Sequence, residues 1–450
     1  MQGGGEQREM WGSRIGFILA AAGSAIGLGN IWRFPYVLGE SGGFAFLVVY
    51  IFFVLFIGIP IMAAELAIGR GSGRNPVGAF RLLKAGTPWW LVGAMGILTG
   101  VIILSYYSVV AGWTLNYVIK AVATFDTAFA TSETAEGTFN HFLSSSGQQV
   151  LFHFLFMILC IVVVSQGIKG GIERWSKILM PTLLVLLVLL IVRAVTLPGA
   201  GAGLAFLLQP DFTKLNLNVI LTALGQAFYS LSLGMGAIIT YGSYLNKKEN
   251  LFSSATTIAG LDMGIALMAG LAIFPAVFAM GFEASSGPGL TYIVLPRVFA
   301  ELPAGQILAI IFFVLLSIAA LTSAISLLEV MVTFVTDELK WPRSRATIIM
   351  AAVAFVLGVP SALGFGVWSE ITIFGQSFFD ASDFITANVM LPLGGLFIAL
   401  FVGWGWDIEK VKKEISMGHT TLRFFTVWIW ILRIAAPIAL LAIFISNIAA

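Results

Sequence analysis

Polar residues interrupt a long apolar stretch near the start of the chain, where residues 23–35 read Gly-Ser-Ala-Ile-Gly-Leu-Gly-Asn-Ile-Trp-Arg-Phe-Pro. Gly27 and Gly29 weaken a helix, and Pro35 removes a backbone donor from it. Asn30 and Arg33 stand where hydrocarbon is expected, and unpaired backbone groups or charges are costly there. We therefore predict a discontinuous helix whose free carbonyls can bind a cation and whose half-helix N-terminus can face an anion.

A second stretch of this kind lies at residues 225–236, Gly-Gln-Ala-Phe-Tyr-Ser-Leu-Ser-Leu-Gly-Met-Gly. Its glycines and serines predict another broken helix, although glycine in a membrane helix commonly serves only close packing. Hydroxyls occur in a third place, at Thr322 and Ser323. Such oxygens suit a hard cation, but in helices they mostly bond to their own backbone.

The elements that must position these residues are membrane-spanning helices. Of the 450 residues, 59% are hydrophobic and only 10% are charged, and the mean hydropathy is +0.98. A soluble protein carries roughly 25% charged residues, whereas apolar runs of about 20 residues cross a bilayer as helices. We predict eleven such segments, near residues 13–37, 42–69, 88–123, 149–166, 172–195, 217–245, 252–282, 305–336, 344–362, 378–404 and 424–448.

The two breaks fall in the first and sixth segments, which favours an all-α membrane protein of two inverted five-helix repeats and one extra helix. Interrupted segments at matching positions of two halves point to a transporter site. The predicted divisions are a cytoplasmic tail at 1–12, the first repeat at 13–195, an extracellular connection at 196–216, the second repeat at 217–404, a cytoplasmic loop at 405–423 and helix 11 at 424–450.

The Lys and Arg residues predict the orientation in the membrane. Of the 24 in the chain, all lie on one set of loops and ends except Arg33, Lys120, Arg193, Lys214, Arg297 and Arg433. The positive-inside rule places this set and the N-terminus in the cytoplasm, and eleven spans then place the C-terminus outside. The net charge of +2 gives no indication of nucleic acid, and the single cysteine, Cys160, excludes a disulfide framework.

The run at 23–35 resembles the first helix of the neurotransmitter:sodium symporters, sodium-coupled transporters of amino acids and amines. The resemblance covers nearly the whole chain. It implies a bacterial inner (plasma) membrane protein that works by alternating access and binds two sodium ions. No protein partner beyond the lipid bilayer is expected.

The resemblance also implies the residues of both sodium sites. The first maps onto Ala25, Asn30, Ser230 and Asp262. The second maps onto the carbonyls of Gly23, Ile26 and Ala319 and the hydroxyls of Thr322 and Ser323. Many members have Asn at the position of Asp262, so the carboxylate is a departure from the family pattern.

Asp262 bears on the need for chloride. Chloride-dependent members carry Ser at the position of Ala266, and the rest of their anion site resembles Tyr50, Gln226 and Ser230. Two sodium ions and a zwitterion leave excess positive charge, which a fixed carboxylate at Asp262 can balance. We therefore expect chloride-independent transport, unless Asp262 simply pairs with a neighbour. Because burial disfavours the charged form of a carboxyl group, proton counter-transport through Asp262 is a further hypothesis.

By the same resemblance, the substrate pocket consists of Ser24, Ala25, Gly27, Leu28, Gly29, Ile103, Tyr107, Tyr229, Ser230, Ser232, Met235, Ser323 and Leu327. Amine-transporting members carry Asp at Gly27, so a substrate of this chain must bring its own carboxylate. Met235 replaces a common aromatic residue, and its flexible thioether can adapt to different guests. We expect neutral hydrophobic L-amino acids, both aliphatic and aromatic, although core packing is the ordinary role of Met235 and Leu327.

Charged pairs and helix breakers suggest the gates. The resemblance implies an outer gate of Arg33 and Asp383 above the aromatic residues Tyr107 and Tyr229. It implies an inner pair of Arg8 and Asp337 near Trp11 and Tyr244. Gly171 and Pro181 bracket a part of helix 5 that is expected to unwind. Charges at helix ends are otherwise simply solvated, and a proline in the first turn of a helix is ordinary.

Other interpretations remain open at this point. The chain could carry another small zwitterion or an amine, or it could be an amino-acid sensor that binds without transporting. An intramembrane enzyme is disfavoured because His141, His153 and His419 are scattered and form no hydrolytic set. Glu65 is expected to bond to the unwound part of helix 6 rather than to carry a proton. The connection at 283–304 is either a lid or an ordinary loop.

Overall fold

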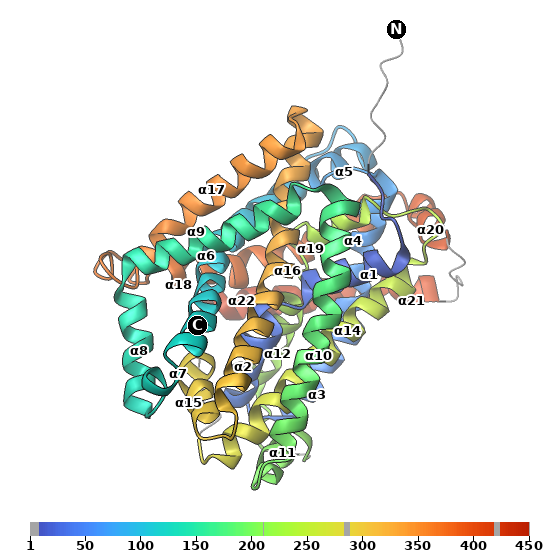
Figure 1. Ribbon diagram of the computed structural model, residues 1–450. Coiled ribbons are helices and arrows are strands. Elements are labelled where there is room, and N and C mark those ends of the chain that lie inside the picture. The colour runs from blue at the N-terminus through green and yellow to red at the C-terminus, as the bar shows by residue number, and fades with distance from the viewer. Residues whose placement is uncertain (1–8, 210, 283–288, 418–423, 450) are drawn as a thin grey trace.

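The structure is a bundle of helices. The computed structural model describes residues 9–209, 211–282, 289–417 and 424–449. Within these ranges the regular elements are helical, and an isolated bridge joins Ile373 and Gln376. Nine helices of this described part are long and apolar enough to cross a membrane, or ten if the bent first pair forms one span. The all-helical membrane architecture is therefore confirmed, and Figure 1 shows its long helices crossing obliquely.

The first half of the chain contains α1 (Arg14–Ala25), η1 (Gly29–Arg33), α2 (Phe34–Glu40), α3 (Phe44–Phe53), η2 (Val54–Gly58), α4 (Ile59–Ser72), α5 (Pro76–Leu83), α6 (Trp90–Ala123), α7 (Phe125–Ala128), α8 (Ser132–Ser144), α9 (Ser146–Val164), η3 (Ile168–Glu173), α10 (Arg174–Val195) and α11 (Ala200–Leu208). The α labels denote α-helices, and the η labels denote π-helical turns.

The second half contains α12 (Leu217–Ser230), α13 (Ala237–Gly242), α14 (Leu251–Ala279), η4 (Leu290–Val294), α15 (Leu295–Ala300), α16 (Gly305–Leu339), α17 (Arg343–Leu363), α18 (Phe378–Phe384), η5 (Ile385–Met390), α19 (Leu391–Leu400), η6 (Phe401–Gly405), α20 (Ile408–Ser416), α21 (Phe425–Trp430), η8 (Ile431–Ala435) and α22 (Ala436–Ala449). The predicted sixth segment corresponds to α12 and α13.

Several π-helical turns directly precede prolines. The turns η1, η2, η4 and η5 each end two residues before one, at Pro35, Pro60, Pro296 and Pro392. A proline ring lacks the N–H of the regular ladder and clashes with the carbonyl four residues earlier, and a wider turn relieves that clash. These prolines therefore widen their helices locally, and the first helix is broken further upstream.

The first break lies at residues 26–28, between α1 and η1. The two halves are bent by 50°, and Ile26 has an extended backbone (φ −75°, ψ 99°). The Gly27 N–H donates to Asn30 Oδ1 at 3.2 Å, and the Leu28 N–H donates to the Tyr107 hydroxyl at 3.1 Å. Side chains thus satisfy backbone donors that the break frees from the helix.

The second break lies at residues 231–236, between α12 and α13. Ser232 (φ 54°), Gly234 (φ 81°) and Gly236 (φ 79°) adopt left-handed conformations, which glycine tolerates without the penalty of a Cβ. The Gly234 N–H donates to Glu65 Oε1 at 2.8 Å. The buried Glu65 on α4 therefore bonds to the unwound segment, as the sequence predicted.

The outer connections contain short helices. The loop at 124–148 contains α7 and α8, and the described part of the connection at 283–304 contains η4 and α15. Tyr292 in η4 is fully buried, and its ring packs against Tyr117 and Phe139 at centroid distances of 5.1 and 5.5 Å. The described part of this connection, from residue 289 on, thus contains packed helical turns.

Candidate functional site

Asn30 and Asp262 form the centre of a fully buried polar cluster between the two breaks. Asn30 lies in η1, and Asp262 lies on α14. The Asn30 side-chain amide donates to Asp262 Oδ1 at 2.7 Å and to Ser230 Oγ at 3.1 Å. Ser230 Oγ donates to Asp262 Oδ2 at 2.8 Å. The structure thus brings together three residues that the resemblance assigns to a first sodium site, and Ala25 ends α1 beside the first break.

Tyr50 and Gln226 complete the surroundings of this cluster. The Tyr50 hydroxyl lies 3.3 Å from Ser230 Oγ and 3.3 Å from Asp262 Oδ2. The Gln226 amide donates to the Gly29 carbonyl at 3.1 Å. A buried carboxylate is costly unless it accepts hydrogen bonds. The Asn30 amide and the hydroxyls of Ser230 and Tyr50 provide them to Asp262. Of the residues that align with a chloride site, Tyr50 and Ser230 therefore contact a carboxylate of the protein itself, and Gln226 bonds to the neighbouring Gly29 carbonyl.

A second group of oxygens lies between the end of α1 and the middle of α16. Thr322 Oγ1 is 3.4 Å from the Ile26 carbonyl and 3.0 Å from the Ala319 carbonyl. Ser323 Oγ is 3.3 Å from the Gly23 carbonyl. All five groups predicted for the second sodium site therefore converge here. Carbonyl and hydroxyl oxygens in this arrangement are suitable ligands for a hard cation.

Helix α10 covers this second group of oxygens. A Cβ added at Gly23 would lie 3.1 Å from Met180 Sδ and 3.2 Å from Thr322 Cβ, so glycine lets the three helices meet. Pro181 lies inside α10. A Cβ at Gly171 would lie 2.2 Å from the Val163 carbonyl. Gly171 therefore permits close contact with α9, and the helix between Gly171 and Pro181 is wound in this structure.

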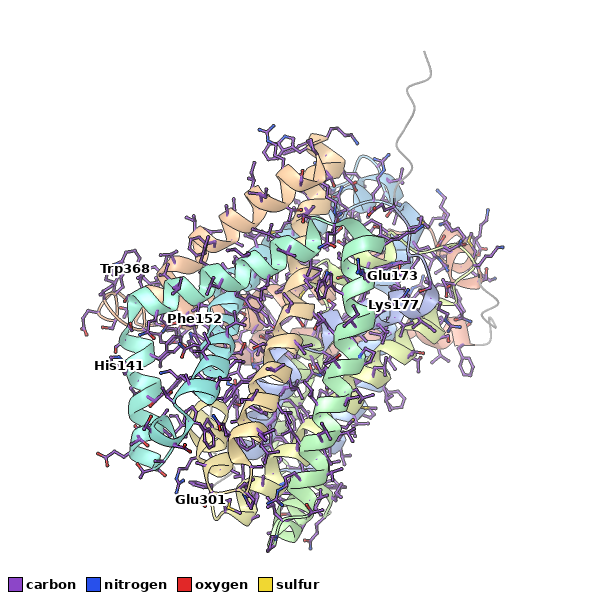
Figure 2. All side chains as sticks on the ribbon, viewed as in Figure 1. His141, Phe152, Glu173, Lys177, Glu301 and Trp368 are labelled. Carbon is purple, nitrogen blue, oxygen red and sulfur yellow. The ribbon has the colours of Figure 1, made fainter. Side chains whose placement is uncertain are left out.

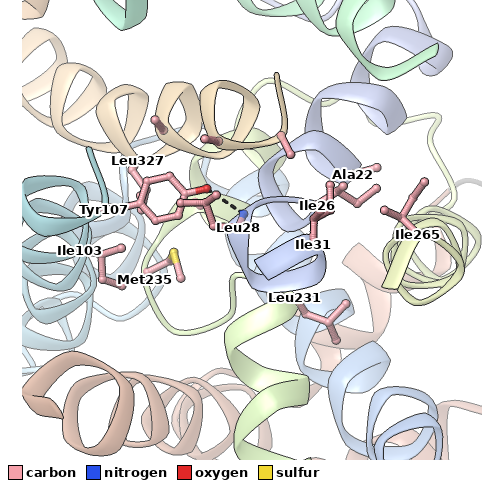
Figure 3. Close-up of a cluster of buried hydrophobic side chains, with 14 of the residues drawn as sticks. Ala22, Ile26, Leu28, Ile31, Ile103, Tyr107, Leu231, Met235, Ile265 and Leu327 are labelled. Atoms are coloured by element: carbon pink, nitrogen blue, oxygen red, sulfur yellow. Dashed lines mark hydrogen bonds between the residues drawn. The ribbon is translucent and has the colours of Figure 1, made fainter. Parts of the chain in front are cut away.

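A cavity lies between the two breaks, α6 and α16. It is lined by Ser24, Ala25, Gly27, Gly29, Ile103, Tyr107, Tyr229, Ser232, Met235, Ser323 and Leu327. Two predicted pocket residues do not line it. Leu28 contributes its backbone N–H to Tyr107, and Ser230 points to the cluster around Asp262. Figure 3 shows Ile103, Tyr107, Met235 and Leu327 facing one another beside the first break.

The cavity has a polar end and an apolar end. A Cβ at Gly27 would lie 2.3 Å from Ser323 Oγ and 2.8 Å from the Tyr107 hydroxyl, so any larger residue would fill the polar end. Among the described residues, no Asp, Glu, Lys or Arg lines the cavity. It therefore suits a guest that brings its own charged groups at one end and an apolar side chain at the other.

The outer charged pair, Arg33 and Asp383, does not form an ion pair within the described residues. The Arg33 guanidinium lies 4.5 Å from the centroid of the Tyr229 ring and 3.4 Å from Gln226 Oε1. Asp383 accepts a hydrogen bond from Tyr106 at 3.0 Å. A second cavity is lined by both charged residues, Tyr107 and Tyr229. The two tyrosines thus separate it from the inner cavity.

The opposite end of the bundle is closed around Trp11. Its indole N–H donates to the Tyr241 carbonyl at 3.0 Å, and its backbone N–H donates to the Tyr244 carbonyl at 3.2 Å. Asp337 accepts from the Asn75 N–H at 2.9 Å. Trp11 and Tyr244 therefore lie together as predicted, whereas the expected partner of Asp337, Arg8, lies outside the described residues.

Glu173 is a buried acid that the sequence analysis did not single out. Its carboxylate accepts from the Gly12 N–H at 2.6 Å, from Ser13 Oγ at 2.8 Å and from Lys177 at 2.6 Å. Figure 2 shows Glu173 and Lys177 close together near the start of α10. Glu173 thus ties the segment before α1 to the start of α10. The signal in the sequence that could have identified Glu173 is the position of this acid, two residues after Gly171.

Glu329 is another buried acid with a charged partner. Fully buried on α16, it forms an ion pair with Arg343 of α17 at 2.5 Å and accepts from the Tyr244 hydroxyl at 2.7 Å. Arg343 also donates to the Val164 carbonyl at 2.9 Å. This ion pair and its hydrogen bonds therefore join α9, α16, α17 and the segment that follows α13, at the end of the bundle that contains Trp11.

Comparison with known proteins agrees with this geometry. The model of the sodium:neurotransmitter symporter family matches residues 8–135 and 138–450. An uncharacterized sodium-dependent transporter of Bacillus subtilis, YhdH, is 39% identical over 440 residues, which cover 97% of either chain. A sodium-dependent transporter of Haemophilus influenzae is 39% identical over 453 residues, which cover 98% of this chain and 99% of the relative.

A solved structure is similar over the same length. The crystal structure of MhsT in complex with L-phenylalanine has a TM-score of 0.90 and 49% sequence identity, and the match covers 98% of this chain and 100% of the MhsT chain. Members of the matched family are membrane transporters, which rules out the intramembrane enzyme considered above. The chain belongs to the sodium:neurotransmitter symporter family.

Proposed function

We propose that this symporter takes up neutral hydrophobic L-amino acids, aliphatic and aromatic, together with two sodium ions. The apolar end of the cavity supports this substrate class, because Ile103, Met235 and Leu327 line it and no ionic side chain from the described part of the chain does. The crystallised relative at 49% identity holds L-phenylalanine, a member of the same class.

The polar end of the cavity favours an amino acid over an amine. Gly27 leaves no room for a side chain beside Ser323 and Tyr107. An amine substrate would therefore lack a carboxylate partner, whereas an amino acid supplies its own. The substrate carboxylate then lies beside the unwound backbone of helix 1, where half-helix dipoles favour negative charge. From there it helps to bind the first sodium ion.

The observation that carries the ion-coupling proposal is the Asp262 carboxylate, within 3.3 Å of Asn30, Ser230 and Tyr50. Sodium in the first site would be held by Ala25, Asn30, Ser230 and Asp262. With the charge of Asp262 in place, two sodium ions and a zwitterion need no chloride for balance. The second ion would be held by the carbonyls of Gly23, Ile26 and Ala319 and the hydroxyls of Thr322 and Ser323.

The proposed architecture has eleven spans and two inverted repeats in a bacterial plasma membrane. Its N-terminus is cytoplasmic and its C-terminus is external.

The transport cycle follows from alternating access. From outside, sodium and substrate order the two breaks and the Arg33–Asp383 gate closes. The inner contacts near Trp11, Tyr244, Asp337 and Arg8 then open, and unwinding between Gly171 and Pro181 releases the second sodium ion. Because the coupling is reciprocal, each ligand raises the affinity for the other. Proton uptake by Asp262 on the return step is a further part of this proposal.

Accumulation in proteoliposomes tests the function. Labelled L-phenylalanine and L-leucine are supplied with a sodium gradient, with potassium as the control cation, and an amine such as serotonin is supplied in parallel. We expect sodium-driven accumulation of both amino acids above the external concentration and none of the amine. Sodium-dependent binding without accumulation would instead identify an amino-acid sensor, and accumulation of the amine would refute the proposed substrate class.

A further inference from the structure

One face of α6 runs alongside the proposed substrate cavity. Gly96, Gly100, Ile103 and Tyr107 are spaced three or four residues apart, so they share one side of this helix. Ile103 and Tyr107 line the cavity. Gly96 and Gly100 continue the same face past the apolar end of the cavity, next to the unwound segment of the second break.

The two glycines have different surroundings. A Cβ at Gly96 would lie 3.3 Å from the Gly236 nitrogen and 3.4 Å from the Met235 carbonyl carbon, which is tight packing against backbone. A Cβ at Gly100 would lie 3.6 Å from the Met235 carbonyl oxygen and 3.8 Å from Leu327 Cδ2. A methyl group therefore fits at Gly100 without displacing any atom. The glycine leaves a space of about that size unfilled.

This space borders the wall of the cavity. Met235 and Leu327, the two residues that bound it, both line the cavity from the other side, and Figure 3 shows both side chains beside Ile103 and Tyr107. Met235 lies between Gly234 and Gly236, in the segment with left-handed conformations. Such a segment lacks a regular hydrogen-bond ladder and can shift more easily than a packed helix. The wall can therefore retreat toward α6 only while the space at Gly100 is open.

Close helix packing, the common role of glycine in membrane helices, does not account for Gly100. Gly112 on the same helix has that role, since a Cβ there would lie 2.8 Å from the His153 nitrogen. Gly100 makes no comparably short contact with any described residue.

We propose that Gly100 determines substrate size: the space behind Met235 and Leu327 lets the cavity expand for large aromatic side chains, whereas small aliphatic substrates do not need it. The inference rests on the proposed function, because it concerns which hydrophobic amino acids the same cavity accepts. Gly100 acts through the cavity wall and does not itself line the cavity.

Equilibrium binding to the purified full-length protein in saturating sodium tests this inference, with L-valine and L-tryptophan as probes. The test variant is Gly100→Ala. The control is Gly137→Ala in α8, where an added Cβ meets no atom within 4 Å, so that it reports the general effect of alanine in a helix. The double variant Gly100→Ala/Leu327→Val removes volume from the opposite side of the same space.

For Gly100→Ala we expect the affinity for tryptophan to fall about tenfold or more relative to that for valine. One methyl group in an apolar pocket changes the discrimination between two substrates by about this factor. We expect the double variant to regain part of the loss and Gly137→Ala to keep the ratio of the unsubstituted protein. An unchanged ratio in Gly100→Ala, or equal loss of both ligands there with no recovery in the double variant, would overturn the inference. Failure of the unsubstituted protein to bind either amino acid would instead refute the proposed function.

Discussion

The Asn30 side-chain amide donates a 2.7 Å hydrogen bond to the Asp262 carboxylate, although 232 residues separate the two in the chain. The contact joins the first broken helix to α14 in the interior of the bundle, where both residues are fully buried. A charge in this position is expensive and is functional by default in a membrane protein.

Replacement of Asp262 should change the need for chloride. In Asp262→Asn the fixed negative charge is lost, so sodium-driven uptake in chloride-free buffer should fall by about two orders of magnitude, corresponding to about 3 kcal/mol for an uncompensated buried charge. Chloride should restore part of the rate. Uptake of labelled phenylalanine in chloride and in gluconate measures the effect, with the exposed Asp211→Asn as the control. A chloride-free rate equal to that of the unsubstituted protein would exclude the balancing role.

Removal of hydroxyls from α16 should weaken sodium binding. Thr322→Ala and Ser323→Ala each delete one proposed ligand of the second site, a loss of about 1 kcal/mol. The sodium concentration for half-maximal substrate binding should therefore rise several-fold. Ser317→Ala, which removes a hydroxyl from the same helix away from this site, is the matched control. If all three variants require the same sodium concentration, the hydroxyls are not ligands.

Neutralisation of Glu173 should loosen the segment before α1. The carboxylate accepts from Gly12 and Ser13, and hydrogen bonds to a charged group contribute about 1.5–3 kcal/mol each. In Glu173→Gln, backbone amides of residues 9–16 should exchange faster with deuterated water, as mass spectrometry can measure. Glu133→Gln, on the exposed surface of α8, controls for charge alone. Unaltered exchange would mean that other contacts hold the segment.

Removal of one partner of the Glu329–Arg343 pair should destabilise the protein more than removal of both. Loss of one partner from a buried pair costs about 3–5 kcal/mol, whereas replacing both with apolar groups is often close to neutral. We therefore expect the melting temperature to fall in Glu329→Leu and to recover in Glu329→Leu/Arg343→Met. A double variant that melts below the single one would contradict this coupling.

The sequence was sufficient to predict the bundle and both breaks, because glycine, proline and polar residues are conspicuous in apolar segments. The resemblance also named eleven residues that line one cavity, and it placed Asp262 beside Asn30. The position of Arg33 over the Tyr229 ring, rather than against Asp383, was not predictable. This position depends on how η1, which carries Arg33, lies relative to α18, which carries Asp383. The same residue types are compatible with a paired and with an unpaired arrangement.

Other features depend on contacts that leave no local pattern. Glu173 bonds to a backbone N–H 161 residues away, and a backbone donor carries no sequence signal. Glu329 is a charge in an apolar helix, but its partner Arg343 belongs to the next helix, and no local pattern shows that the two meet. The role of Gly100 depends on the absence of a close neighbour, which only the packing reveals.

The most direct test of the central claim is the chloride dependence of the unsubstituted transporter. Labelled L-tryptophan is supplied to proteoliposomes with an inward sodium gradient, in buffers whose anion is either chloride or gluconate. We predict the same initial rate and the same accumulation in both, because the Asp262 carboxylate balances the charge of the bound sodium. Accumulation that requires chloride would contradict the assignment of Asp262 as the internal anion.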